Sequence, residues 1–73
     1  MEYIGPGDEE KISRAIKNSG LTDREIARKM GVSVSSANAY RYGNRKPSAG
    51  RLSRLARVLN VDVRELLREE VTD

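Results

Sequence analysis

The sequence predicts an all-α fold, a compact bundle of five short helices. Apolar residues recur at the helical spacing of three and four in five segments, and each segment follows a residue that favours a helix N-cap. No segment of useful length alternates with the period of two expected of a strand. The 73 residues fit one domain. We expect an N-terminal arm over 1–7, the helical domain over 8–71 and a tail over 72–73.

The first helix is predicted over about 9–18. Asp8 is its N-cap, and Gly20 stands where a glycine ends a helix. The residues of its apolar stripe are Ile12, Ala15 and Ile16.

Two shorter helices are predicted over about 23–30 and 34–42. The first begins with a capping box, in which Thr22 and Glu25 each accept from the other's backbone amide. Ser33 is positioned to cap the second. The glycines that end them are Gly31 and Gly43.

The last two helices are predicted over about 49–59 and 63–70. Ser48 caps the first of them, and Asp62 with Glu65 repeats the capping box for the second. The stripe of the 49–59 helix consists of Leu52, Leu55, Ala56 and Leu59.

Charge is distributed in blocks that the net charge of +3 conceals. Residues 1–10 carry −4, residues 11–61 carry +10, and residues 62–73 carry −3. A strongly basic middle between acidic ends indicates a polyanionic partner, or else a solvated surface.

Composition excludes several classes of function. The chain has no Cys and no His, so we expect no metal, no cofactor and no enzyme activity. The longest apolar run is two residues, so we expect no membrane span and no signal peptide, and a cytoplasmic protein.

The 23–30 and 34–42 helices are separated by about three residues, the tight joint that a helix-turn-helix requires. Suitable residue types fill its demanding positions: a small residue at the crossing, a glycine in the turn and apolar residues facing inward. These residues are Ala27, Gly31, Ile26, Met30, Val32, Ala37 and Tyr40.

Four stretches extend the pattern: I-x-x-A-I-K-x-S-G-L-T, R-E-I-A-R-K-M-G-V-S, Y-G-N-R-K-P-S and L-x-x-L-A-R-V-L-N-V-D-V-R-E-L-L. Over about residues 11–67 the chain resembles the lambda-repressor/Cro-like helix-turn-helix proteins, the xenobiotic-response-element class. The resemblance implies a lambda-repressor-like bundle and a sequence-specific DNA-binding transcriptional regulator, with repression the expected mode. Its partner would be double-stranded DNA with a two-fold operator, so that the protein would associate with the nucleoid by binding DNA. No small-molecule effector is evident.

The resemblance implies that the third helix reads bases. Asn38 suits adenine, Ser35 suits several base edges, and Val34 and Ala39 suit a thymine methyl group. The predicted base-reading residues are Ser33, Val34, Ser35, Asn38 and Ala39. The predicted phosphate contacts are Arg24, Arg41, Tyr42, Asn44, Arg45, Lys46, Ser48 and Arg51.

Two residues depart from the family pattern. Asp23 replaces a frequent Gln that contacts phosphate and braces the third helix, and Arg41 replaces a frequent Glu near the end of that helix. We therefore expect binding that depends on phosphate contacts and DNA shape more than on base hydrogen bonds.

A homodimer, in solution or on DNA, is expected because operators mirror a protein two-fold axis. In the family the last helix commonly supplies the contact. The candidates are Val58, Leu66, Leu67 and Val71, with an intramolecular core role favoured for Leu66.

Two other functions remain open from the sequence. One is a protein-interaction module, such as an antirepressor, antitoxin or bridging factor, which Asp23 and the lean third helix favour. The other is a membrane-surface protein, because residues 51–57 form a basic amphipathic stretch.

Overall fold

The computed structural model describes residues 6–68. Its elements are α1 (Glu9–Ser19), α2 (Asp23–Met30), α3 (Val34–Arg41), α4 (Ala49–Leu59) and a 3₁₀ turn, η1 (Val63–Glu65). The predicted all-α fold is confirmed. Residues 1–5 of the predicted arm and residues 69–73, which include the tail and Val71, lie outside the described part.

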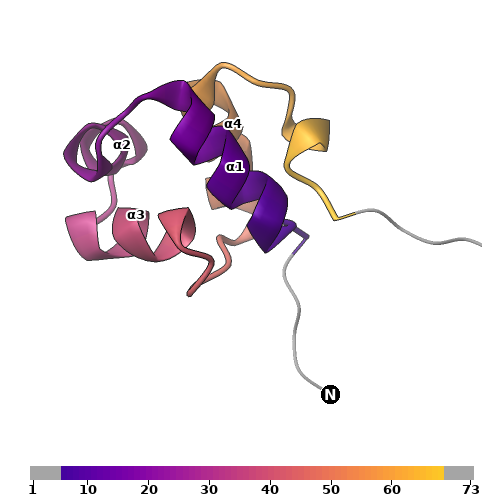
Figure 1. Ribbon diagram of the computed structural model, residues 1–73, viewed down its shortest axis with the longest axis horizontal. Helices are drawn as coiled ribbons and strands as arrows, with labels where there is room; N and C mark the ends of the chain where they lie inside the picture. Colours follow the sequence, from indigo (N-terminus) through magenta and orange to yellow (C-terminus); the bar gives the residue numbers. More distant parts are fainter. Residues whose placement is uncertain (1–5, 69–73) are drawn as a thin grey trace, which may run out of the picture.

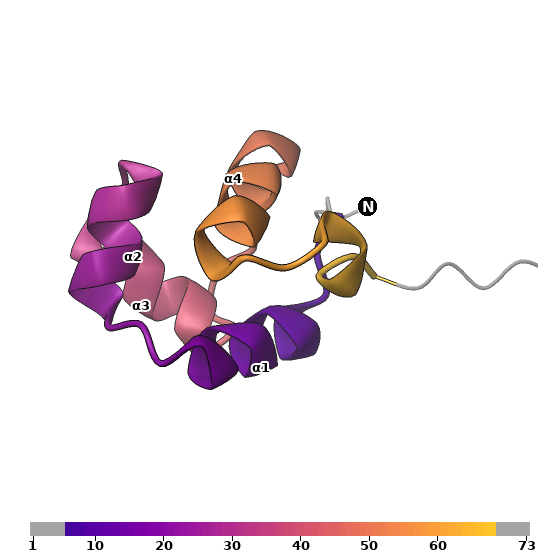
Figure 2. The ribbon, with the colours of Figure 1, turned by 90° about the horizontal axis from the view of Figure 1, so that it is seen from above.

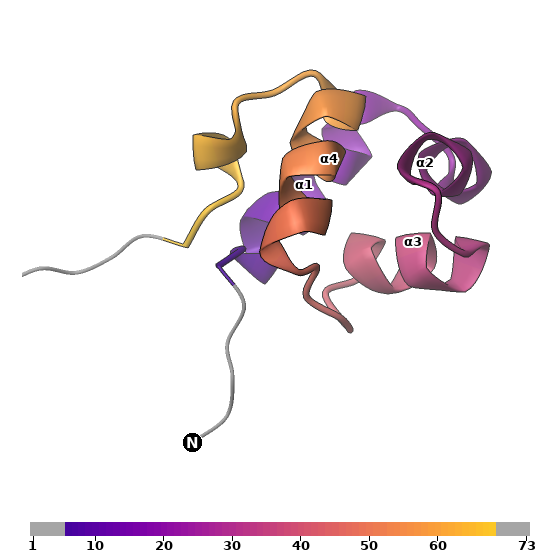
Figure 3. The ribbon, with the colours of Figure 1, turned by 180° about the vertical axis from the view of Figure 1, so that it is seen from behind.

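The four helices pack around one core, in which α3 lies against both α2 and α1, and α2 also lies against α4. In Figure 1, α2 and α3 lie together on the left, while α1 crosses in front of α4. The view from behind in Figure 3 shows α4 in front of α1, with α2 and α3 together on the other side. Figure 2 shows from above that η1 lies beside the start of α1, away from α2.

The helix caps predicted from the sequence are present. The Asp8 carboxylate accepts from the backbone amides of Glu10 and Lys11 at 2.9 and 3.0 Å. Thr22 and Glu25 form the reciprocal capping box at the start of α2. These caps satisfy the free amides that begin each helix, so sequence and local structure agree at the helix starts.

The core lies where the four helices meet. Twelve apolar side chains there are buried: Ile12, Ile16, Ile26, Ala27, Met30, Ala37, Tyr40, Leu52, Leu55, Ala56, Leu59 and Leu66. Five of the seven helix-turn-helix residues are among them, and Val32 is half-buried against this core. Gly31 has the left-handed conformation predicted for the turn.

The prediction of a fifth helix over 63–70 is wrong within the described residues. The capping box of Asp62 and Glu65 is present, but it starts only the three residues of η1. Leu67 then pairs with Gly7 in an antiparallel bridge, and the Arg68 amide donates to the Pro6 carbonyl at 2.9 Å. The pairing with residues 6–8 takes the Arg68 amide and the Leu66 carbonyl, two groups that a longer helix would have used.

Gly7 makes this pairing possible. A Cβ atom at Gly7 would lie 2.7 Å from the Ile12 Cδ1 atom, so any side chain would displace the core below it. The Asp8 amide next to it donates to the Leu66 carbonyl at 2.8 Å. Residues 6–8 are therefore part of the folded unit and not of a free arm.

Candidate nucleic-acid interface

The outward face of α3 and its N-cap carry small and polar residues and one exposed valine. Ser33, Val34, Ser35 and Asn38 are exposed, with Val34 48% accessible, while Ala39 is half-buried. The opposite face, with Ala37 and Tyr40, is buried. Four of the five predicted base-reading residues are therefore on α3, and the fifth, Ser33, is its N-cap. All of them except Ala39 are open to solvent.

The α2–α3 joint fixes the direction of this helix. Gly31 has a φ of 72°, a left-handed conformation that strains other residues. The amides of Gly31 and Val32 both donate to the Ala27 carbonyl, at 2.9 and 3.0 Å. Because Ala27 is buried and small, the helices approach closely and α3 is held at the edge of the molecule (Figure 1).

Arg45 is bound to the start of α3. Its Nη1 atom donates to the Ser36 hydroxyl at 2.9 Å, and the Ser33 hydroxyl donates to the same oxygen at 3.0 Å. Ser36 is not among the site residues predicted from the sequence, although a serine three residues after the capping Ser33 can be recognised there. This buried hydroxyl places an exposed guanidinium next to the predicted base-reading residues.

The other predicted phosphate contacts differ in accessibility. Arg24, Asn44 and Ser48 are exposed, and so is Tyr42 at 60%. Arg51 is exposed but donates to the Tyr40 hydroxyl at 3.1 Å, which ties it to the end of α3. Lys46 is half-buried and borders a hollow shared with Glu9 and Glu10, where a phosphate would meet carboxylates.

Arg41 does not have the position predicted for a phosphate contact. Its Nε atom donates to Asp23 Oδ1 at 2.7 Å, and its Nη2 atom donates to the Leu21 carbonyl at 2.6 Å. The side chain is 18% accessible. The guanidinium is thus directed at its own protein where α3 meets α2, and we leave Arg41 out of the phosphate contacts proposed below.

Asp23 is the centre of the same network. Its Oδ2 atom accepts from Asn38 Nδ2 at 3.0 Å, on the outward face of α3. The hydrogen bonds from Asn38 and then from Arg41 lower the pKa of the Asp23 carboxyl below its ordinary value. The carboxylate is therefore ionised and neutralised by its partners, and it links the two helices of the motif.

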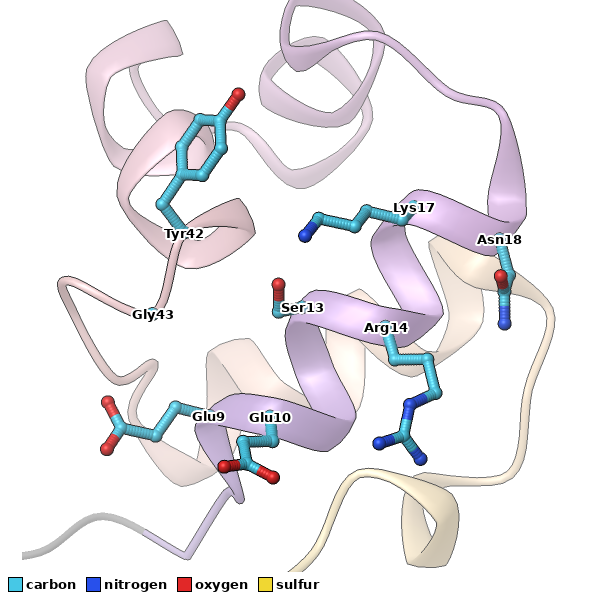
Figure 4. Close-up of a pocket in the computed structure, with 8 residues that line it drawn as sticks. All are labelled: Glu9, Glu10, Ser13, Arg14, Lys17, Asn18, Tyr42 and Gly43. Carbon is cyan, nitrogen blue, oxygen red and sulfur yellow. The ribbon is translucent and has the colours of Figure 1, made fainter.

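A groove lies between α1 and the residues after α3. Figure 4 shows Lys17 and Ser13 of α1 on one wall and Tyr42 with Gly43 on the other. Glu9 and Glu10 occupy one end of the groove. Carboxylates beside its lysine and arginine make it a poor phosphate site, so it stays outside the candidate interface.

The dimer candidates divide by burial. Leu66 has no accessible surface and belongs to the core, as favoured from the sequence. Val58 and Leu67 are half-buried and pack against the core. Only these two remain accessible to a partner within the described residues.

Residues 6–68 contain no group of three or more Cys, Asp or Glu residues arranged to hold a metal ion. Over the same residues, no helix combines the length and apolar character needed to cross a bilayer.

Comparison with known proteins identifies one family. A helix-turn-helix family of the Cro/C1 type matches residues 12–66, which include α2, α3 and the joint between them. Comparisons with curated proteins and with solved structures find no match.

Proposed function

The chain belongs to the Cro/C1-type helix-turn-helix family of DNA-binding domains, and we propose that it is a sequence-specific transcriptional regulator. The observation that carries the proposal is the exposed face of α3, with the Arg45 guanidinium fixed beside its start. A helix with small and polar residues fits a major groove, and adjacent cations neutralise the phosphates on its edges.

In this proposal base contacts come from Ser33, Val34, Ser35, Asn38 and Ala39. The phosphate contacts come from exposed groups on α2, on the loop after α3 and at the start of α4. These are Arg24, Tyr42, Asn44, Arg45, Ser48 and Arg51. Ser48 adds backbone amides at a helix start, which suit an anion.

Selection of bound sequences from a random duplex library tests the proposal. We expect enrichment of one site and an affinity that falls steeply with salt. Arg24→Ala should reduce the slope of log K against log salt by about 1 and weaken all duplexes alike. A library that yields no enriched site, together with a flat salt response, would contradict the proposal.

Repression is the mode we propose, because a domain that occupies an operator excludes other proteins from it. A reporter whose promoter overlaps the selected site should lose expression when the protein is supplied. A rise in expression would identify an activator instead.

We also propose that two copies bind one two-fold operator, since half-sites one turn apart require two recognition helices. Val58 and Leu67 supply the apolar surface in this proposal. Sedimentation velocity with and without the selected duplex should show two protomers per duplex. A single protomer on a full-length site would contradict it.

The alternative function, a protein-interaction module, is favoured in the sequence mainly by Asp23, which places a carboxylate where DNA should approach. Arg41 pairs with that carboxylate at 2.7 Å. With the charge compensated, we favour DNA binding over the interaction module.

A further inference from the structure

The two oxygens of the Asp23 carboxylate accept hydrogen bonds from two different side chains of α3. Oδ1 accepts from Arg41 Nε at 2.7 Å and Oδ2 accepts from Asn38 Nδ2 at 3.0 Å. Arg41 also donates to the Leu21 carbonyl, so its guanidinium is held from two directions. This arrangement holds the carboxylate with one oxygen turned toward Asn38.

An ionised carboxylate can only accept hydrogen bonds. Asn38 must therefore turn its NH₂ group toward Asp23, because the opposite orientation would place oxygen against oxygen. The Asn38 side chain is otherwise exposed. Its Oδ1 atom and its second N–H are consequently left for a partner outside the protein.

This outward pair distinguishes the bases in a major groove. Adenine offers an N6–H donor for the Asn38 Oδ1 atom and, beside it, the N7 acceptor for the second N–H of Asn38. Cytosine offers an N4–H donor for the same Oδ1 atom. Guanine and thymine present O6 and O4 at the corresponding places, and these oxygens would face Oδ1 unfavourably.

We propose that Asp23 is a positioning residue that sets the base preference of Asn38. It fixes the amide so that the recognition helix accepts bases with an exocyclic amino group, adenine above all, and rejects their oxo counterparts. The inference rests on the proposed function, because it requires α3 to lie in the major groove. Asp23 then acts on DNA through Asn38 and not by repelling phosphate.

The isosteric variant Asp23→Asn reverses the geometry. The guanidinium of Arg41 would keep the single remaining oxygen, since a hydrogen bond from a charged donor is the stronger one. The new NH₂ group would face Asn38, which must then turn its own oxygen inward and its NH₂ outward. An outward NH₂ group can donate to O6 or to N7 of guanine, which both accept hydrogen bonds.

The experiment measures binding by fluorescence anisotropy to four duplexes that differ only at the base pair read by Asn38. That pair is identified as the one where Asn38→Ala abolishes discrimination. Wild-type protein should prefer adenine over guanine by about tenfold or more. With Asp23→Asn the ratio should fall to about threefold or less, or invert.

Glu10→Gln is the matched control, because it removes one carboxylate charge from the exposed face of α1, away from Asn38. This variant should keep the wild-type base preference. Thermal unfolding of each variant establishes that it is folded at the assay temperature, and the base ratio then reports orientation and not stability.

Two results would overturn the inference. Asp23→Asn could leave the adenine-to-guanine ratio unchanged, or it could tighten all four duplexes equally with a steeper salt dependence, which would show that the carboxylate acts on phosphates. If the wild-type protein instead shows no base preference at any position, the proposed function fails, and the inference fails with it.

Discussion

The Asp23–Arg41 pair differs from the other ion pair among the described residues in its surroundings. The two side chains are 18% and 23% accessible for Arg41 and Asp23, against 83% and 48% for Arg64 and Asp62. Water screens an exposed pair, so such pairs contribute little to stability. Arg41 also satisfies the Leu21 carbonyl, which no water molecule need then reach.

Replacing Arg41 with Ala should therefore destabilise the protein by about 1–3 kcal/mol, because it leaves two shielded acceptors without their donor. Arg64→Ala is the matched control, an arginine removed from an exposed ion pair. Urea unfolding measures both, and we expect a shift of the midpoint for Arg41→Ala alone. Equal midpoints for the two variants would show that shielding does not strengthen the Asp23–Arg41 pair.

The same residues show what a sequence can and cannot predict about this site. The exposed positions of Ser33, Ser35 and Asn38 follow from helical periodicity, and the structure confirms them as exposed. The pairing of Asp23 with Arg41 cannot be predicted in this way, because the two residues are 18 positions apart and meet only where α2 packs against α3. Taken separately, one looks like a repulsive charge and the other like a phosphate contact.

At the scale of elements, the joint between α2 and α3 depends on the backbone of Gly31. Its φ of 72° nearly equals the 73° of Gly20, which ends α1. Around Gly31 only the Arg54 Nη1 atom lies within 4 Å of an added Cβ, at 3.8 Å, and nothing does around Gly20. The two glycines are therefore alike in strain and in space, but only Gly31 sets the direction of α3.

We expect Gly31→Ala and Gly20→Ala each to lower the free energy of unfolding by about 1 kcal/mol or somewhat more, as strained left-handed alanines do. DNA binding should separate the two variants. At a temperature where both are folded, Gly31→Ala should lose affinity for the selected duplex and Gly20→Ala should keep it. Equal affinity for both would show that the joint tolerates the change without moving α3.

Helix starts were predictable and the last element was not. The starts depend on caps and turn glycines that act within four residues, and α1 to α4 begin where those signals place them. Beyond η1, the N-terminal segment intervenes: Pro6 and Gly7 pair with residues more than 50 positions away. A local capping signal cannot reveal such a long-range partner.

Across the described part of the molecule, the arrangement of the helices separates the charges. The Gly7–Leu67 bridge brings the acidic start of α1 beside η1, which carries Asp62 and Glu65. Figure 1 shows this end of the bundle away from α2 and from the start of α3. A polyanion approaching the molecule is thereby attracted to the basic helices and repelled from the acidic end, which supports the orientation that we propose, with α3 against DNA.

The same carboxylates determine how stability responds to pH. Hydrogen bonds from Asn38 and Arg41 lower the pKa of Asp23, those from Thr22 lower the pKa of Glu25, and those from Arg64 lower the pKa of Asp62. The unfolded chain therefore binds protons more readily than the folded one at acid pH. The stabilisation is complete above the ordinary carboxyl pKa and is lost as the pH falls through the lower, folded value.

We therefore expect the free energy of unfolding to be nearly constant from about pH 8 to 5.5, where a chain without His has no side chain of ordinary pKa to titrate, and to fall below about pH 4.5. Urea unfolding followed by circular dichroism at several pH values measures it. Glu25→Gln should flatten part of the acid limb, because its capping box persists without a titrating group. Parallel samples at high salt control for general charge repulsion. If the free energy of unfolding of Glu25→Gln falls with acid pH as fully as that of the wild-type protein, the loss of stability belongs to other groups.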